Sequence, residues 1–192
     1  MNFGDDTVWA VVLGAVLATA GGFVATRLEA FFGRRERERS AALLFGELLS
    51  VIELLLVLGD EARSRGDPFG PLTLRMLRAA KRETETYERN REALYDLRDA
   101  ALRARVHTIM VRVTLSLEGV FESAEYIERL QAGGGPEADS ADARRLAYFI
   151  ESRQGAFDFA IAARDPLKEV VAALQPLAKQ PFGDHHAIAR SY

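Results

Sequence analysis

The chain is 192 residues long, is 48% hydrophobic, and carries 25 basic against 28 acidic side chains with no cysteine. The missing thiols exclude disulfides, thiolate metal sites and cysteine nucleophiles, and the near-neutral charge argues against nucleic-acid binding, which requires a basic stripe. This composition, with few turn-forming residues, predicts an all-α fold in which a helical domain of roughly 150 residues follows a membrane anchor.

The predicted anchor lies near the N-terminus. The nineteen residues from Val8 to Thr26 carry no charge, and as a helix they would reach roughly 28 Å, close to a bilayer hydrocarbon core of about 30 Å. We therefore predict a single transmembrane helix within residues 1–32. The small residues Ala18-Thr19-Ala20 suggest a cleavable signal peptide as the alternative, but a signal peptide begins with a basic region, and this chain begins with aspartates.

The charges on either side of the span predict its orientation. Asp5 and Asp6 precede it, and four basic residues follow it closely. The four are Arg34, Arg35, Arg37 and Arg39. Because cytoplasmic flanks are enriched in basic residues, we expect the N-terminus outside and the remaining chain in the cytoplasm, at a bacterial-type inner (plasma) membrane. Glu36 and Glu38 offset part of the basic charge, so we interpret the arginines as a topology determinant in contact with membrane lipid and not as a site for a particular anionic lipid.

Small residues recur at every fourth position of the span. They are Ala10, Gly14, Ala18, Gly22 and Thr26. This spacing places them along one slowly rotating face of a helix, and small side chains let two transmembrane helices approach closely. The stripe predicts a helix-packing face for a transmembrane helix of another subunit or of a second copy, so the protein is expected in an oligomer or complex.

A second apolar segment, Ala41 to Leu58, lies within the region 33–58 and is interrupted by Glu47 and Glu53. Two carboxylates inside a bilayer cost on the order of 5 to 6 kcal/mol, which offsets the gain from the apolar side chains. We therefore predict that the helix continues past the arginines and becomes a buried helix of the cytoplasmic domain. The alternative is a membrane hairpin, which would place the C-terminal domain outside.

Turn-forming residues and helical periodicity organise the remaining chain. Residues 59–71 contain several glycines and prolines and predict a loop. From 72 to 180 the periodicity predicts an antiparallel helical bundle of long amphipathic helices. One of them, from near Asn90 to Leu130, would be a coiled-coil-like rod about 60 Å long if unbroken.

Several residues predict where the later helices begin and end. A run of three glycines ends the long helix, and Asp139 or Ser140 can cap the next one. The sequence Asp165-Pro166 predicts either a new helix start or a kink. Pro176 and Pro181 are expected to close the regular structure, which leaves residues 181–192 as a tail.

No residue cluster predicts catalysis, a cofactor or a metal. A di-iron bundle needs Glu-x-x-His pairs, but alanine stands three residues before His107, so His107 is interpreted as a partly buried structural residue. His185 and His186 lack a third ligand, which favours a solvated tail over a weak metal site. Phosphate-binding loops and nucleophile elbows are absent from the sequence.

The sequence resembles no family closely enough to transfer functional residues from it. We expect a single-pass membrane protein that is not an enzyme and acts as an accessory, assembly or scaffolding subunit of a membrane complex through helix-helix packing. The alternative is a homo-oligomeric membrane effector or sensor that signals through its cytoplasmic helices.

Overall fold

The computed structural model describes residues 3–66, 69–132, 135–136, 140–183, 185 and 187, with side chains from Phe31 onward. Every regular element in these ranges is a helix, and no strand occurs among them, which confirms the all-helical class. The elements are α1 (Phe3–Ser64), α2 (Pro71–Arg89), the 3-10 helix η1 (Arg91–Asp96), α3 (Ala100–Ala132), α4 (Ala141–Ile161) and α5 (Arg164–Ala178).

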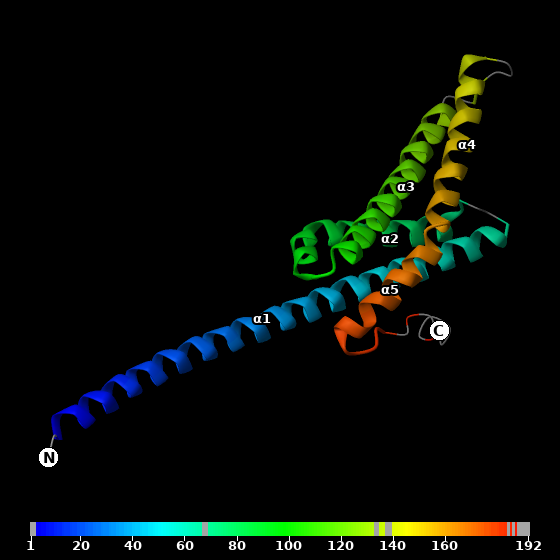
Figure 1. The fold of residues 1–192 in the computed structure, drawn as a ribbon. Helices are drawn as coiled ribbons and strands as arrows, with labels where there is room; N and C mark the ends of the chain where they lie inside the picture. The colour runs from blue at the N-terminus through cyan, green and yellow to red at the C-terminus, as the bar shows by residue number, and fades with distance from the viewer. Residues whose placement is uncertain are drawn as a thin grey trace.

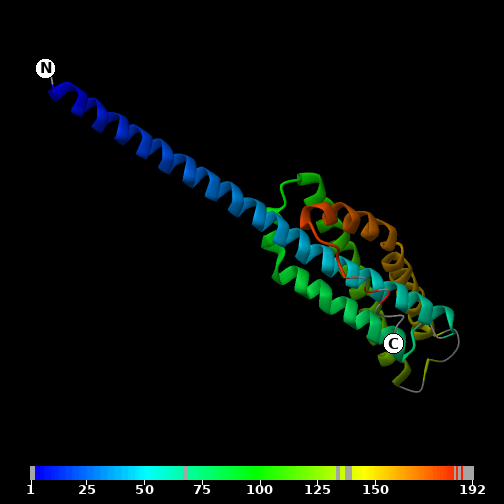
Figure 2. The same ribbon diagram turned by 90° about the horizontal axis from the view of Figure 1, so that it is seen from below.

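The longest element, α1, is one unbroken helix of 62 residues, about 93 Å long at 1.5 Å per residue. Its N-terminal half extends away from the other helices, and its C-terminal half lies among them (Figure 1, Figure 2). The helix passes through the four arginines without a turn, as predicted. The chain therefore does not reverse between Thr26 and Ala41, as a membrane hairpin would require. Residues 59–64, expected in the loop, are also helical.

The C-terminal half of α1 forms the centre of the hydrophobic core. Among the described side chains, the stretch Phe31–Ser64 is long and apolar enough to span a membrane by length and composition, yet half of its most apolar part is buried inside the protein. Its buried apolar residues recur at helical spacing: Ala41, Ala42, Phe45, Leu48, Leu49, Ile52 and Leu56. They meet α2 on one side and α5 on the other. Each fully buried large side chain contributes roughly 1.5–3 kcal/mol.

The connection from α2 to α3 departs from the prediction of one rod between Asn90 and Leu130. The chain forms the short helix η1, and its backbone becomes extended at Leu97. The Asp99 carboxylate then accepts hydrogen bonds from two first-turn amides of α3 at 2.8 and 3.1 Å, so it caps a new helix. Leu94 and Leu97 are buried here, because this connection packs against α1. The helix is therefore broken at this connection, the condition for the 60 Å rod is not met, and α3 is about 50 Å long.

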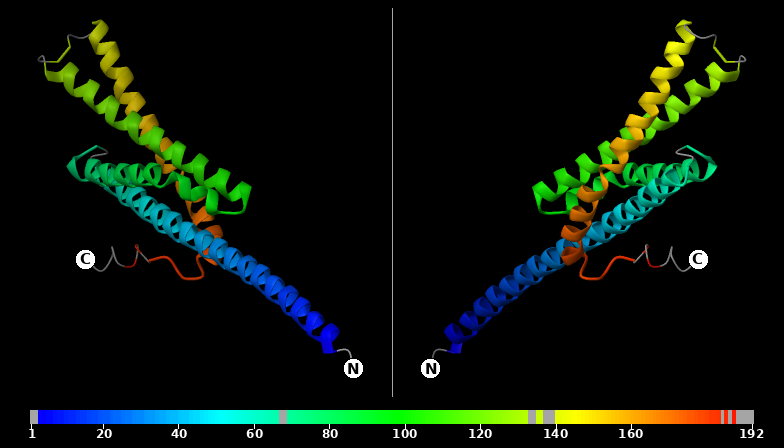
Figure 3. Two further views of the ribbon diagram at one scale, coloured as in Figure 1. Left: turned by 90° about the vertical axis from the view of Figure 1, so that its left-hand side faces the viewer. Right: turned by 90° about the vertical axis from the view of Figure 1, so that its right-hand side faces the viewer.

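The two helices α3 and α4 pack along each other and project from the other helices as an arm (Figure 3). α3 ends at Ala132, where the predicted glycine run begins. The Ser140 side chain accepts a hydrogen bond from the Ala143 amide at 3.0 Å, which confirms one of the two proposed caps of α4. The other candidate, Asp139, lies outside the described residues.

A break separates α4 from α5, so the new-helix alternative holds over the kink. Pro166 lies in the first turn of α5, where its missing amide hydrogen removes no helical hydrogen bond. The predicted cap, Asp165, is itself helical, and Ala163 occupies the N-cap position. Pro176 was expected to close the regular structure, but α5 continues through it to Ala178, and the left-handed backbone of the C-cap residue Lys179, with φ 56°, ends the helix.

Candidate functional site: the surfaces around α1

The predicted packing face falls on the extended half of α1. Its residues are Ala10, Gly14, Ala18, Gly22 and Thr26, all within the helix Phe3–Ser64. Their side chains lie outside the described ones. The structure therefore places the stripe on a helix, and the packing face stays a prediction.

Two of the four arginines fasten α1 to its neighbours. The Nε atom of Arg39 donates to the Ala178 carbonyl at 3.1 Å, at the C-terminal end of α5, where the helix dipole favours a cation. The Nε atom of Arg37 lies 3.8 Å from an Asp96 oxygen of η1. The interpretation as topology and lipid residues missed these contacts, because both partners are distant in the sequence and no local pattern shows them.

Glu38 forms a further link between α1 and the connection after η1. Its Oε1 accepts the Arg98 amide at 3.1 Å, and its Oε2 lies 3.3 Å from Arg98 Nε. The Glu38 side chain is only 15% exposed, so water screens this pair less than an ordinary surface pair. Sequence reasoning set the Glu38 charge against the neighbouring arginines, whereas the fold balances it with Arg98.

The other two arginines, Arg34 and Arg35, are exposed. The Arg35 guanidinium lies 4.4 Å from the centroid of the Phe31 ring, a cation-π contact. Phe31 and Phe32 are 42% and 61% exposed. Aromatic rings beside basic residues at the end of an apolar span are typical of the interface between membrane and water.

The described start of the C-terminal tail contacts α1, which corrects the expectation of a solvated tail for residues 182, 183 and 185. A Cβ atom built on Gly46 would lie 2.1 Å from Phe182 Cζ, so only glycine lets the ring approach the helix this closely. The Gly183 amide donates to Glu47 Oε1 at 3.0 Å, and His185 Nε2 lies 2.9 Å from Glu47 Oε2. We call this set of interactions the tail contact.

A pocket of about 290 Å³ between α1 and α5 is partly enclosed by the tail contact. Glu53 lines it and is only 5% exposed, with its Oε1 3.6 Å from Lys168 Nζ. Ser50 also lines the pocket, but its hydroxyl donates to the Gly46 carbonyl at 2.8 Å. The Ser50 proton is thus held by a carbonyl and not by a general base, so these side chains do not form an activated nucleophile.

His107 is partly buried, as predicted. Its Nδ1 and the Tyr87 hydroxyl oxygen are 2.8 Å apart and share a hydrogen bond. Tyr87 is fully buried, and this burial raises the pKa of its hydroxyl. No group of three metal-ligating side chains occurs among the described residues, and His186 lies outside them.

An ion cluster joins the C-terminal end of α1 to α4 and α5. Asp60 lies 2.8 Å from Arg63 and 3.2 Å from Arg164, and Arg63 also pairs with Asp158. Burial alone would raise the pKa of Asp158, but hydrogen bonds from Arg63 and Gln154 outweigh it and hold that pKa below its ordinary value. These paired charges hold helix ends together and leave the Asp158 carboxyl ionised at neutral pH, so it cannot act as a general acid there.

The arm exposes several large apolar side chains. Val111 and Leu115 of α3 are 38% and 61% exposed, and Phe159 of α4 is 52% exposed. Further along α4, Tyr148 and Ile150 are 65% and 45% exposed. Val111 and Leu115 lie one turn apart on the same face of α3, and neighbouring exposed apolar groups are a feature of protein-protein contact surfaces.

No family model, curated protein or solved structure matches this chain. A functional proposal therefore depends on the geometry of this chain alone. That geometry consists of the α1 surfaces, the tail contact and the exposed arm.

Proposed function

We propose that this protein is a single-pass membrane protein acting as a non-catalytic accessory, assembly or scaffolding subunit of a membrane protein complex. In this proposal the N-terminus lies outside, and the cytoplasmic part is an antiparallel bundle of long amphipathic helices. The observation that carries the proposal is the continuity of α1, which contains both the predicted span and the central helix of the core. A partner helix packed on the span is then attached to the cytoplasmic helices without a flexible linker.

The exposed arm supports the scaffolding part of this proposal. Its apolar side chains, among them Leu115 and Phe159, point to a surface that a second protein covers. The arm projects away from the extended half of α1 (Figure 3). A partner bound there would stand clear of the membrane, while the span contacts another partner within it.

Substitutions in the stripe test the packing face. Replacing Gly14 and Gly22 with leucine adds bulk where close backbone approach is expected, so association with the partner should be lost. Ala20→Leu is the matched control, because Ala20 lies about 200° around the helix from Ala18, on the opposite side. Association is measured by mass spectrometry of chains that co-purify with the detergent-solubilised protein. Association that survives both glycine changes would show that the stripe is not the packing face.

Single cysteines test the orientation, since the chain has none of its own. Phe3→Cys should react with a membrane-impermeant maleimide applied to intact cells. Tyr148→Cys, on the arm, should react only after the membrane is opened. The reverse pattern would contradict the proposed topology.

A second candidate function is a homo-oligomeric membrane effector or sensor. The tail contact favours it, because Phe182 and Glu47 connect the tail to the same helix that contains the predicted span. Because α1 is unbroken, a rotation of the span would also move Glu47 and so change the tail contact. Native mass of the purified protein separates the two candidates, since a sensor of this kind assembles from copies of this chain alone.

A further inference from the structure

We propose that the end of the helical domain nearest the predicted span is a docking surface for anionic lipid headgroups. This inference rests on the proposed insertion of α1 into a membrane. The surface combines cations from two elements that are far apart in the sequence: Arg34 and Arg35 of α1, and Lys179 at the end of α5. The exposed rings of Phe31 and Phe32 lie beside the arginines.

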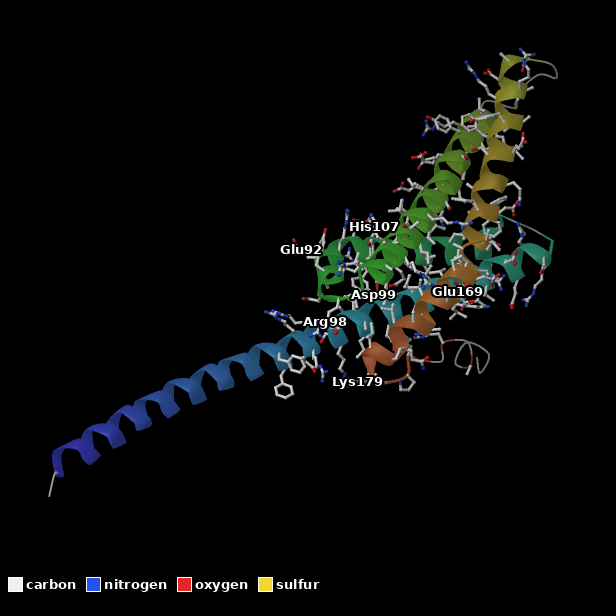
Figure 4. All side chains as sticks on the ribbon, in the orientation of Figure 1. Glu92, Arg98, Asp99, His107, Glu169 and Lys179 are labelled. Carbon is white, nitrogen blue, oxygen red and sulfur yellow. The ribbon has the colours of Figure 1, made fainter. Side chains whose placement is uncertain are left out.

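The contacts of α1 fix the position of this surface. The bond from Arg39 to Ala178 holds the end of α5, and therefore Lys179, level with Arg39. The Glu38–Arg98 pair holds the connection after η1 one residue earlier on α1. Figure 4 shows Arg98 and Lys179 on opposite sides of α1 where it leaves the other helices. The end of α5 and the connection after η1 thus lie on opposite sides of α1, about 10 Å along the helix from Phe32.

Three carboxylates at this end pair with arginines of the same chain. Glu36 lies 4.0 Å from Arg39, Glu38 binds Arg98, and Asp96 lies 3.8 Å from Arg37. In the part of the chain that the structure describes, Arg34, Arg35 and Lys179 have no carboxylate within ion-pair distance.

Two exposed acids at this end, Asp99 and Glu92, have no ion-pair partner among the described residues, and the Asp99 carboxylate accepts the amides of Ala101 and Leu102 at the start of α3. Figure 4 places Glu92 on the side of η1 away from α1, farther from the helix than Arg98. The cations Arg34, Arg35 and Lys179 thus face Asp99, which is held at the start of α3, and the more distant Glu92, so the unpaired charge of the described side chains beside α1 is positive. The alternation of arginines and glutamates in the sequence understated this charge.

The cations lie within reach of a membrane surface. A bilayer has a headgroup layer of roughly 5–8 Å on each side of its hydrocarbon core. With the core ending near Arg27, Arg34 stands about 10 Å beyond it along α1, and Lys179 at the level of Arg39 stands about 18 Å beyond it. The outer headgroups are thus roughly 10 Å from the backbone of Lys179. This is comparable with the Debye length of about 8 Å at physiological ionic strength, and the long side chain shortens the gap.

Fluorescence tests the docking on the full chain. Tyr95, on η1, is 79% exposed, and Tyr95→Cys provides a unique attachment point for a donor dye. The protein is reconstituted into phosphatidylcholine vesicles with or without phosphatidylserine, each with an acceptor on a trace of lipid headgroups. Energy transfer should be larger with phosphatidylserine and should lose that excess in 1 M salt, where the Debye length is about 3 Å.

Charge variants identify the residues responsible. Because α1 is unbroken, docking tilts the helix and the domain together, and each Arg or Lys near an anionic surface changes the ratio of the docked to the undocked tilt by about fivefold. The triple variant Arg34→Gln, Arg35→Gln, Lys179→Gln should therefore abolish the excess transfer. The matched control, Arg65→Gln with Arg75→Gln, removes two exposed cations near the opposite end of α1 and should keep it.

The outcomes separate this inference from the proposed function. Equal transfer in both vesicle types, from a protein that resists carbonate extraction, overturns the docking surface and leaves the membrane anchor intact. A protein that carbonate extracts from the vesicles overturns the anchor, and the docking surface fails with it. Excess transfer that persists in the triple variant shows that these three cations are not the lipid contacts.

Discussion

Replacing Gly46 with alanine adds one carbon where the Phe182 ring now lies. The new Cβ would stand 2.1 Å from Phe182 Cζ, closer than atoms can approach, so the ring must leave α1. Alanine favours a helix interior over glycine by about 0.5–1 kcal/mol. Losing a partly buried ring costs about 1 kcal/mol, near half of full burial, and the hydrogen bonds to Glu47 loosen with it. We expect the free energy of unfolding to fall by no more than about 1 kcal/mol while the tail is released.

A double-mutant cycle separates these two effects. Phe182→Ala alone should lower the free energy of unfolding by about 1 kcal/mol. Gly46→Ala added to that variant should then raise it by about 0.5–1 kcal/mol, because the new methyl group meets no ring. Gly59→Ala is the matched control, since its Cβ would lie 3.7 Å from the nearest atom, in ordinary contact, and should be stabilising outright.

Two measurements on the full chain in detergent give the result. Denaturant unfolding followed by circular dichroism yields the free energies, and hydrogen exchange of the Phe182 and Gly183 amides reports whether the Gly183 amide still donates to Glu47. Tail amides that stay protected in Gly46→Ala would refute the argument. So would an alanine at 46 that has the same effect with and without Phe182.

Three further changes test the core and its polar contacts. Tyr87→Phe removes the partner of His107 and should lower the free energy of unfolding by about 1 kcal/mol; an unchanged denaturation midpoint contradicts this. In the unsubstituted protein burial raises the pKa of Tyr87, so the contribution of its hydroxyl to the free energy of unfolding is complete below the unfolded pKa and is lost as pH rises through the folded pKa. An absorbance titration should therefore show one tyrosine that ionises above the ordinary tyrosine pKa. The lowered pKa of Asp158 has the opposite sign: the stability from its pairing with Arg63 is present above the unfolded pKa and is lost as pH falls through the folded pKa. Asp158→Asn should therefore cost about 0.5 kcal/mol at neutral pH, a small value because the carboxylate is half exposed, and the difference should vanish in acid; a difference that persists there rejects the assignment. Leu49→Ala should cost about 2–5 kcal/mol, since Leu49 is fully buried, and a loss under 1 kcal/mol in the same unfolding assay would mean that the site collapses around the cavity.

Much of the helical organisation could be predicted from local patterns. The buried face of Ala41 to Leu58 follows from apolar residues at helical spacing, which any helix must gather on one side. The Ser140 cap follows from a hydroxyl placed before a helix, where free amides need an acceptor. The glutamates inside the apolar segment favoured burial in a protein core and not insertion into a bilayer. Half of the most apolar part of Phe31–Ser64 is buried in the protein, which agrees with that prediction.

The break before Asp99 could not be predicted in the same way. The apolar periodicity from Asn90 to Leu130 continues across it, because Leu94 and Leu97 are buried residues in either arrangement. The chain turns there so that these leucines can pack against α1 while α3 leaves in a new direction. Periodicity records that a residue is buried and not which helix buries it.

The sequence by itself determined the long apolar α1, its polar interruptions and the helical class, since each depends on neighbours within a few residues. Only the tertiary structure decided the charge of the surface around α1. Asp96 and Arg98, in the connection that follows α2, pair with Arg37 and Glu38, and the end of α5 brings Lys179 beside Arg39. Pairing between distant segments selects which charges stay exposed, and that selection exists only after the chain has folded.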